Sequence, residues 1–217
     1  MLKLKWMLMV LTMVVGYANN GFIDAIPNPV LKTKIMQLTK DCIIRNTDIY
    51  TSCYSDELNR VVFSVYRVDY RAHRGNISTR PKFWNDRIAK QQLKWYQDSG
   101  YDRGHLAWDA AFDYDQDALN WTYNLELNIV PMKPNVNRFQ WSHIESIAMR
   151  LAMKYELVVV DLLTASDETL KNTSLNIPKE MYKFIMYGDT TRCFKVDNFN
   201  SKINVKPYDV KCKDILK

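Results

Sequence analysis

The sequence lacks several patterns that would place it in well-known classes of protein. It has no Cys-x-x-Cys pair and no cysteine close to a histidine, which argues against a zinc site. After residue 18 no apolar run is long enough to suggest a membrane span. No internal repeat, low-complexity stretch or long linker divides the chain. These absences favour one compact domain, for which 217 residues are sufficient.

Histidine is also scarce, because the chain has only three: His73, His105 and His143. His105 has the most informative neighbours, since it lies in the run Tyr-Asp-Arg-Gly-His-Leu from 101 to 106. Imidazole changes charge near neutral pH, and the planar guanidinium of Arg103 can hold phosphate oxygens. Gly104 is expected to let the backbone turn sharply or approach a ligand. A base beside a phosphate-binding cation suits hydrolysis of a phosphodiester.

The N-terminus has the pattern of a secretory signal peptide. Lys3 and Lys5 precede an apolar run at 7–15, and small residues at Gly16 and Ala18 suit a signal peptidase. We expect cleavage after Ala18 and a mature domain at 19–217, secreted or periplasmic and without a membrane segment. An uncleaved anchor is the alternative. Loss of the two lysines lowers the net charge from +6 to +4 (6 − 2), which still favours a polyanionic partner.

The four cysteines are expected to form disulfides, because an even number in an exported chain is typical of a disulfide framework. Three pairings are possible. The local pairing joins Cys42 to Cys53 and Cys193 to Cys212, and each bond would close a short loop. We predict this local pairing.

The hydrophobic patterns predict strands on both sides of a helix. Residues 61–70, 125–130 and 157–163 are expected to be strands, the second ended by Pro131, and 181–187 with 192–196 a hairpin. Residues 83–96 could form a short helix. The clearest helix is 137–155, where apolar residues recur at steps of three and four. The expected class is α+β with a mostly antiparallel sheet and one long central helix.

Several segments together resemble the DNA/RNA non-specific endonucleases, a family of ββα-metal nucleases. The matching segments are Asp102–His105, Asn128–Pro131, Asn137, Trp141, Glu145 and the run Ile-Pro-Lys-Glu-Met-Tyr-Lys at 177–183. The four-residue motif alone is moderate evidence, but the whole set in order is specific. The sequence departs from the family pattern at Trp108, at Met132 and near Asp161, and none of these changes removes a proposed catalytic group.

The resemblance implies a ββα-metal core and a role for each residue around His105. His105 would be the general base that takes a proton from the attacking water. Asn137 would bind one catalytic metal ion, and a neutral carbonyl oxygen with waters suits Mg²⁺, with Mn²⁺ as the alternative. The other interpretation of Asn137 is a helix N-cap, with Gln140 completing a capping box. One asparagine could serve both purposes.

The remaining site residues have weaker support. Glu145 lies eight residues after Asn137, ~12 Å along an α-helix, so it would hold a metal-bound water rather than the ion. A solvent-facing helical glutamate is the alternative. Arg103 would orient or neutralise the phosphate, unless it pairs with Asp102. Asn128 would orient groups around the site, and Arg80 is the best match to the family's upstream phosphate-binding arginine.

These assignments predict an exported, Mg²⁺-dependent endonuclease that hydrolyses DNA and RNA. Because water rather than a ribose hydroxyl is the nucleophile, both nucleic acids are possible substrates. The alternatives are a non-catalytic, secreted nucleic-acid-binding protein on the same scaffold and a toxin effector delivered to rival cells.

Overall fold

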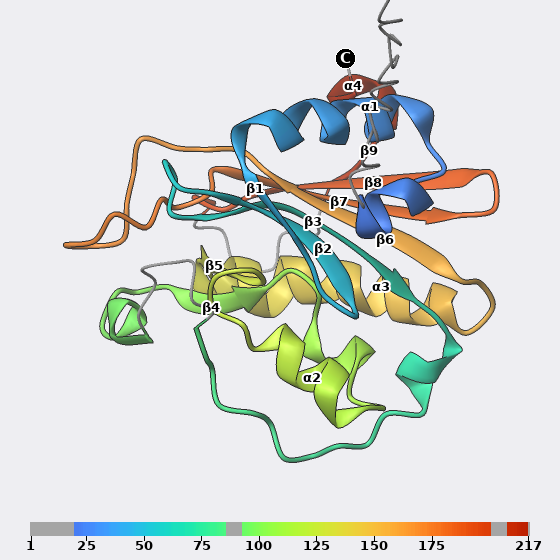
Figure 1. Cartoon of the computed structure of the whole chain (residues 1–217), viewed down its shortest axis with the longest axis horizontal. Helices are drawn as coiled ribbons and strands as arrows, with labels where there is room; N and C mark the ends of the chain where they lie inside the picture. Colours follow the sequence, from blue (N-terminus) through green and yellow to red (C-terminus); the bar gives the residue numbers. More distant parts are fainter. Residues whose placement is uncertain (1–19, 86–92, 201–207, 217) are drawn as a thin grey trace, which may run out of the picture.

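The computed structural model describes residues 20–85, 93–200 and 208–216, and a seven-stranded antiparallel sheet is at its centre (Figure 1). The strands lie in the order β1-β2-β3-β6-β7-β8-β9. Their bounds are β1 Ile43–Asn46, β2 Tyr50–Ser55, β3 Arg60–Val68, β6 Leu157–Leu163, β7 Glu180–Tyr187, β8 Thr190–Asp197 and β9 Tyr208–Val210. A separate antiparallel pair joins β4 (Asp102–His105) to β5 (Ile129–Met132).

Helices cover both faces of the large sheet. In Figure 1, α1 and α4 lie on one side, and α2, α3 and the β4–β5 pair lie on the other. Their bounds are α1 Pro29–Leu38, α2 Gln116–Thr122, α3 Ser142–Ala152 and α4 Cys212–Ile215, with a π-helix at Val136–Trp141 and 3₁₀ turns at Gly21–Ala25, Thr39–Asp41, Tyr70–His73, Leu93–Tyr96 and Asp109–Ala111. The structure therefore has the expected α+β class. Among the described residues, no helix combines the length and hydropathy that crossing a bilayer needs.

Local sequence explains where these elements begin and turn. The Asn28 side chain accepts a hydrogen bond from Leu31 N, and Pro29 occupies the first turn of α1. Asp115 caps α2 in the same way through Ala118 N. Gly188 has a positive φ of 49° in the turn between β7 and β8, a conformation that glycine adopts readily. The predicted hairpin is present, with longer strands than expected.

Two buried clusters fill the two faces of the large sheet. Side chains alternate between faces along each strand, so Phe63 and Phe184 pack toward α1, whereas Tyr66 and Ile185 pack toward α3. A bulge between Cys53 and Tyr54 shifts the register of β2 against β3. The strands predicted at 61–70 and 157–163 contribute side chains to both cores.

Three predictions about local structure need correction. The helix expected at 137–155 is not one α-helix, because a π-helix precedes α3. Pro131 does not end β5 but lies within it, opposite Arg103. A proline can do so in a two-stranded pair, where no second neighbour needs its missing N–H. In the expected helix at 83–96, Trp84 instead forms a parallel bridge with Asn124, and residues 86–92 lie outside the described residues.

The structure contains both local disulfides. The Cα atoms of Cys42 and Cys53 are 5.6 Å apart, and those of Cys193 and Cys212 are 5.3 Å apart. Cys53 and Cys193 lie in the core that faces α1. The predicted signal peptide at 1–18 lies outside the described residues.

Candidate active site

The motif at 102–105 forms β4, a short strand paired with β5 on the α3 side of the large sheet. Gly104 lies opposite Val130, and a Cβ atom at this position would meet the Met132 side chain at 2.3 Å. The glycine therefore serves strand packing, and its backbone shows no left-handed turn. The expectation that Gly104 would face a ligand is not supported by this arrangement, because the residue is buried.

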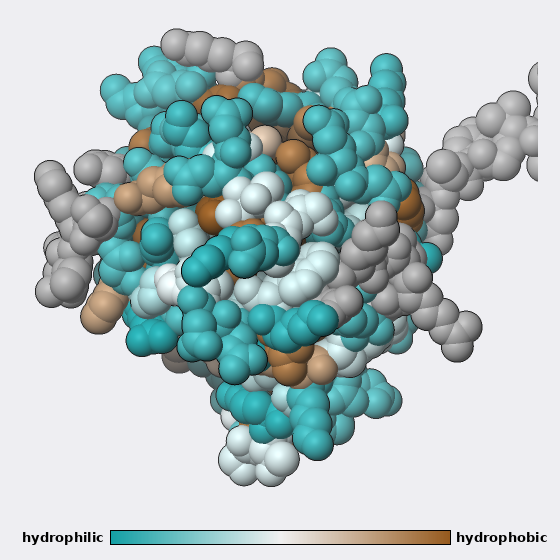
Figure 2. All heavy atoms as spheres, turned by 90° about the vertical axis from the view of Figure 1, so that its left-hand side faces the viewer, coloured by the Kyte–Doolittle hydropathy of each residue, from teal (hydrophilic) through white to brown (hydrophobic). Residues whose placement is uncertain are grey.

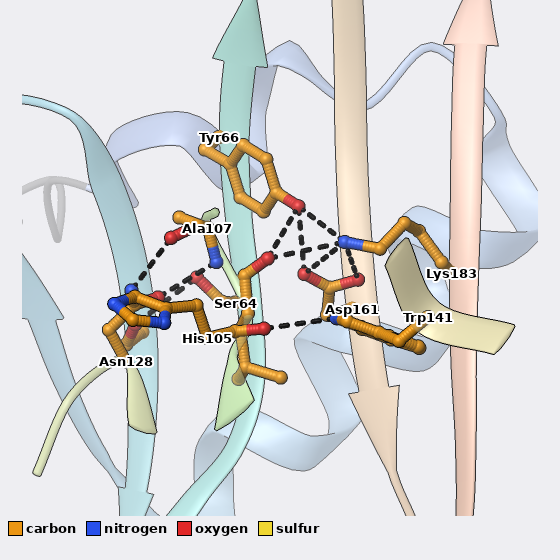
Figure 3. A network of polar contacts seen from close by, with 10 residues as sticks. Ser64, Tyr66, His105, Ala107, Asn128, Trp141, Asp161 and Lys183 are labelled. Atoms are coloured by element: carbon orange, nitrogen blue, oxygen red, sulfur yellow. Dashed lines mark hydrogen bonds and ion pairs between the residues drawn. The ribbon is translucent and has the colours of Figure 1, made fainter. Parts of the chain in front are cut away.

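One side chain and one backbone hydrogen bond hold the chain at the end of β4. Trp141 Nε1 donates to the carbonyl of His105 at 3.0 Å, and Leu106 N donates to the carbonyl of Asn128 at 3.0 Å. Figure 3 shows that the imidazole of His105 and its carbonyl oxygen lie on opposite sides of the backbone. The carbonyl thus fixes the strand, and the ring is left for other contacts.

Asn128 is fully buried and holds two backbone segments together. Its Oδ1 accepts from Ala107 N at 2.8 Å, and its Nδ2 donates to the carbonyls of Ala107 and Thr122, also at 2.8 Å (Figure 3). These bonds occupy both N–H groups of the amide. This geometry fits the orienting role predicted for Asn128 and not a direct contact with substrate.

The His105 imidazole lies among aromatic rings. Its centroid is 5.8 Å from that of Phe83 and 5.0 Å from that of Tyr123. Its Nε2 atom is buried and has no hydrogen-bond partner among the described residues. Burial lowers the pKa of His105 to about 4, and Arg80 and Arg103 act in the same direction against the charge of Asp109. The ring is therefore neutral at pH 7.

Arg80 and Asp109 lie close to this ring. Arg80 Nε is 3.3 Å from Asp109 Oδ2, and Arg80 Nη2 is 3.3 Å from Asp113 Oδ2. Asp109 also accepts a hydrogen bond from the Tyr123 hydroxyl at 3.0 Å. The structure thus brings the predicted phosphate-binding arginine to His105, but already paired with two carboxylates. The sequence prediction missed Asp109, although a carboxylate four residues after the motif histidine was a visible signal.

Asp102 and Arg103 point to different partners. Asp102 accepts from Arg138 Nη2 at 2.7 Å and from Asn137 Nδ2 at 3.1 Å. The Arg103 guanidinium instead lies over the Phe83 ring, 4.4 Å from its centroid. The alternative ion pair between Arg103 and Asp102 does not form. Asp102 thus accepts hydrogen bonds from two side chains of the π-helix. The N–H donors of Arg103 remain available, since no described residue accepts a hydrogen bond from its guanidinium.

Asn137 lies inside the π-helix and not at its start. Asn135 precedes the helix, and no side chain caps it, so the N-cap interpretation of Asn137 is wrong. With Nδ2 on Asp102, no described residue donates a hydrogen bond to Asn137 Oδ1. Asn137, Asp102 and Arg103 line a cleft of about 780 Å³. Phe83, Lys94, Tyr96, Gln97 and Tyr101 are among its other lining residues.

Glu145 is partly buried in the first turn of α3, so the alternative of a solvent-facing glutamate is not supported. Burial raises the pKa of Glu145 to about 8, with Lys183 opposing this rise and Asp161 and Asp109 adding to it. The charge of Asp109 therefore acts on the pKa values of both His105 and Glu145. Because a π-helix precedes α3, the distance between Asn137 and Glu145 cannot be obtained from the rise of an α-helix alone.

The residues present fit a hard metal ion held by few protein ligands. No group of three or more His, Cys, Asp or Glu that could enclose an ion occurs among the described residues. A neutral amide oxygen in an open cleft leaves most positions of an ion to water, which suits a cation such as Mg²⁺. The end of the molecule that carries β4 and β5 is largely hydrophilic (Figure 2). A polar ligand therefore suits this face.

Comparison with solved structures shows the same fold in an endonuclease. The structure described as the EndoG/EndoGI complex, on the mechanism of EndoG inhibition, superposes with a TM-score of 0.65 at 20% identity. The match covers 84% of this chain and 87% of that chain.

Sequence comparison finds nuclease relatives over shorter segments. Human mitochondrial endonuclease G is 37% identical over 65 residues, which is 30% of this chain and 22% of that protein. The mitochondrial nuclease of Saccharomyces cerevisiae is 26% identical over 121 residues, or 53% of this chain and 37% of that protein. The chain thus matches between about a fifth and two fifths of the length of these relatives. The model of the DNA/RNA non-specific endonuclease family, in contrast, matches residues 28–216, so the chain belongs to that family.

Proposed function

We propose that this protein is a metal-dependent nuclease that hydrolyses phosphodiester bonds of DNA and RNA, with His105 as general base. The observation that carries the proposal is the neutral, partly buried imidazole at the end of β4. Its Nε2 has no hydrogen-bond partner among the described residues, and its ring lies against Phe83, which lines the cleft together with Arg103. A base must be deprotonated before it can accept a proton. The low pKa of His105 meets this condition at neutral pH.

His105 would remove a proton from a water molecule as it attacks the phosphorus atom. The unpaired guanidinium of Arg103 can donate to the non-bridging phosphate oxygens in a planar fork. Arg80, held between Asp109 and Asp113, adds positive charge near the imidazole and favours its neutral form. Because no ribose hydroxyl takes part, the same groups can act on DNA and RNA.

Asn137 is the residue that we propose holds the metal ion, through Oδ1. Its Nδ2 bond to Asp102 fixes the amide, so that Oδ1 remains for the ion. Glu145, in the first turn of α3, would accept a hydrogen bond from a water of the ion. When bound, Mg²⁺, or Mn²⁺ as the alternative, would stabilise negative charge on the phosphate and the leaving oxygen.

Export of the protein through a signal peptide at 1–18 is also a proposal. Both disulfides support it, because such bonds form and persist in oxidising compartments. The relatives above are described as mitochondrial, so the compartment needs a direct test. N-terminal sequencing of protein recovered from the culture medium or periplasm should begin at Asn19.

A plasmid-nicking assay with and without EDTA tests the proposed activity. Purified protein with Mg²⁺ should nick supercoiled DNA and degrade RNA, and EDTA should abolish both reactions. DNA binding without nicking under any divalent cation would favour the non-catalytic alternative. A neighbouring immunity gene would favour the toxin effector, which shares the chemistry.

A further inference from the structure

Lys183 ends the family-like run at 177–183, and the proposed function gives it no role. Its side chain is completely buried, as is that of Asp161, its partner in the register of β6 and β7. Lys183 Nζ lies 2.8 Å from Asp161 Oδ1 and 3.1 Å from Oδ2. Two full charges thus lie inside the core that faces α3.

Tyr66 on β3 completes a three-residue network with this pair. Its hydroxyl accepts from Lys183 Nζ at 2.7 Å and lies 2.9 Å from Asp161 Oδ2 (Figure 3). Burial, followed by the charge of Asp161, raises the pKa of Tyr66 well above its usual value. The hydroxyl therefore keeps its proton and can donate it.

The network ends on the backbone of the catalytic strand. The carbonyl oxygen of Leu106, the residue after His105, lies 3.0 Å from the Tyr66 hydroxyl and 3.2 Å from Lys183 Nζ. Trp141, which binds the carbonyl of His105, has its ring 4.4 Å from Lys183 Nζ. The network therefore holds Leu106 directly and touches the residue that holds His105.

Stability alone is a poor explanation for such a network. A buried ion pair gains little over well-packed apolar residues of similar volume, because both charges lose their hydration. The apolar residues opposite, Phe184 and Val160, show that the same two strands also support a hydrophobic face. What distinguishes this network is that Tyr66 and Lys183 both contact the Leu106 carbonyl, next to His105.

We propose that Tyr66, Asp161 and Lys183 form a positioning unit that fixes the Leu106 carbonyl and thereby the imidazole of His105. The inference rests on the proposed function. The three side chains cannot touch substrate, because they are buried, so they act through the backbone of the motif. Misplacement of a catalytic group by about 1 Å can cost on the order of 10²-fold in rate.

Tyr66→Phe is the sharpest test, because it removes one hydroxyl and leaves the ion pair in place. Tyr54→Phe is the matched control, since Tyr54 is an equally buried tyrosine of the same core whose hydroxyl bonds Asn59 instead. On a short oligonucleotide, Tyr66→Phe should lower kcat about 10-fold to 10²-fold with KM unchanged. Tyr54→Phe should leave both constants unchanged. An unchanged kcat in Tyr66→Phe would overturn the proposal.

A second measurement does not depend on activity. The chain has three histidines, so protein labelled on histidine gives three ring signals, assigned with His73→Gln and His143→Gln. The His105 signal should shift in Tyr66→Phe, whereas the other two stay in place, and Tyr54→Phe should shift none. A stationary His105 signal overturns the proposal even if kcat falls. If the wild-type protein cuts no nucleic acid but the His105 signal still shifts in Tyr66→Phe, only the proposed function would be rejected.

The charges can be tested without leaving one of them unpaired. Lys183→Met alone would bury a lone carboxylate, so the double variant Asp161→Leu with Lys183→Met is used, which should fold. It should also lower kcat and shift the His105 signal. A folded double variant with wild-type kcat and an unmoved signal would show that the ion pair has no positioning role.

Discussion

The two faces of the seven-stranded sheet use the same strands for different purposes. Toward α1, strands β3, β6 and β7 present apolar residues such as Phe63, Val160 and Phe184, and both disulfides reach into this core. Toward α3, the alternate positions of β6 and β7 include the buried Asp161 and Lys183. Both faces are packed hydrophobic cores, but only the face toward α3 also supports the candidate active site.

This difference has a physical basis in the cost of burying polar groups. A buried polar group without a partner costs several kcal/mol in an apolar environment, so it is retained only where partners are supplied. On the α3 face, the last residue of β4 and the two that follow supply partners through the carbonyls of His105, Leu106 and Ala107. Substitutions on the two faces should consequently differ in their effects on stability and on activity.

His105→Ala should give the largest effect on activity. Without the base, the nicking rate should fall by at least the ~10²-fold to 10⁴-fold typical of general-base catalysis. Because His105 is not a proposed metal ligand, Mg²⁺ or Mn²⁺ binding should remain, as titration calorimetry would show. The control is His143→Ala, which replaces an exposed histidine on α3. A folded His105→Ala protein that nicks DNA at the wild-type rate would remove the basis of the proposed mechanism.

Asn137→Ala should affect activity through the metal. Loss of the amide oxygen should weaken Mg²⁺ binding, and activity should partly return at high Mg²⁺ concentration. Because a ligand that binds the folded state raises its stability, Mg²⁺ should increase the Tm of the wild type more than that of Asn137→Ala. Asn120→Ala on α2 provides the control. Equal Mg²⁺ affinity in the folded variant and the wild type would contradict the ligand assignment.

The sequence was sufficient for elements whose pattern is local. Residues 157–163 form β6 as predicted, and the spacing of the cysteines indicated both disulfides. The π-helix at Val136–Trp141 could not be predicted from a period near 3.6, because its apolar positions fit an α-helix equally well. For the same reason Asn137 resembled an N-cap, whereas it is the second residue of the π-helix.

The residues of the candidate site were predictable where they belong to a sequence motif. They were less predictable where their contacts come from segments that are distant in the sequence. Arg103 and Asn137 line the same cleft, and the His105 ring lies against Phe83, which also lines it. The pairing of Arg80 with Asp109 and Asp113 depends on how the loops after β3 and β4 pack. Lys183 was visible as a motif residue, but its proposed role depends on a contact with Tyr66, 117 residues earlier in the chain. Such contacts are a property of the fold and not of local sequence.

Removal of a disulfide should reduce stability and leave the chemistry intact. Loops of this size contribute about 3 kcal/mol by restricting the unfolded chain. The Cys193–Cys212 bond spans 19 residues and the Cys42–Cys53 bond spans 11, so removal of the former should cost ~0.5 kcal/mol more. Urea unfolding of the two double Cys→Ser variants measures this difference. At a temperature where both are folded, kcat should match the wild type, and a large loss of kcat would contradict the separation of the two faces.

Glu145→Gln should change stability in a way that depends on pH, which separates it from the disulfide variants. Burial raises the pKa of Glu145 from 4.5 to about 8, so the folded protein binds this proton more tightly than the unfolded chain does. The associated stability is fully present below the unfolded pKa and is lost as pH rises through about 8. Glutamine cannot ionise, so in EDTA the Tm of Glu145→Gln should equal that of the wild type at pH 4 and exceed it at pH 9. Glu156→Gln, an exposed glutamate paired with Arg67, should show no such rise. A Tm difference for Glu145→Gln that is constant with pH would mean that the carboxylate is already ionised in the folded protein.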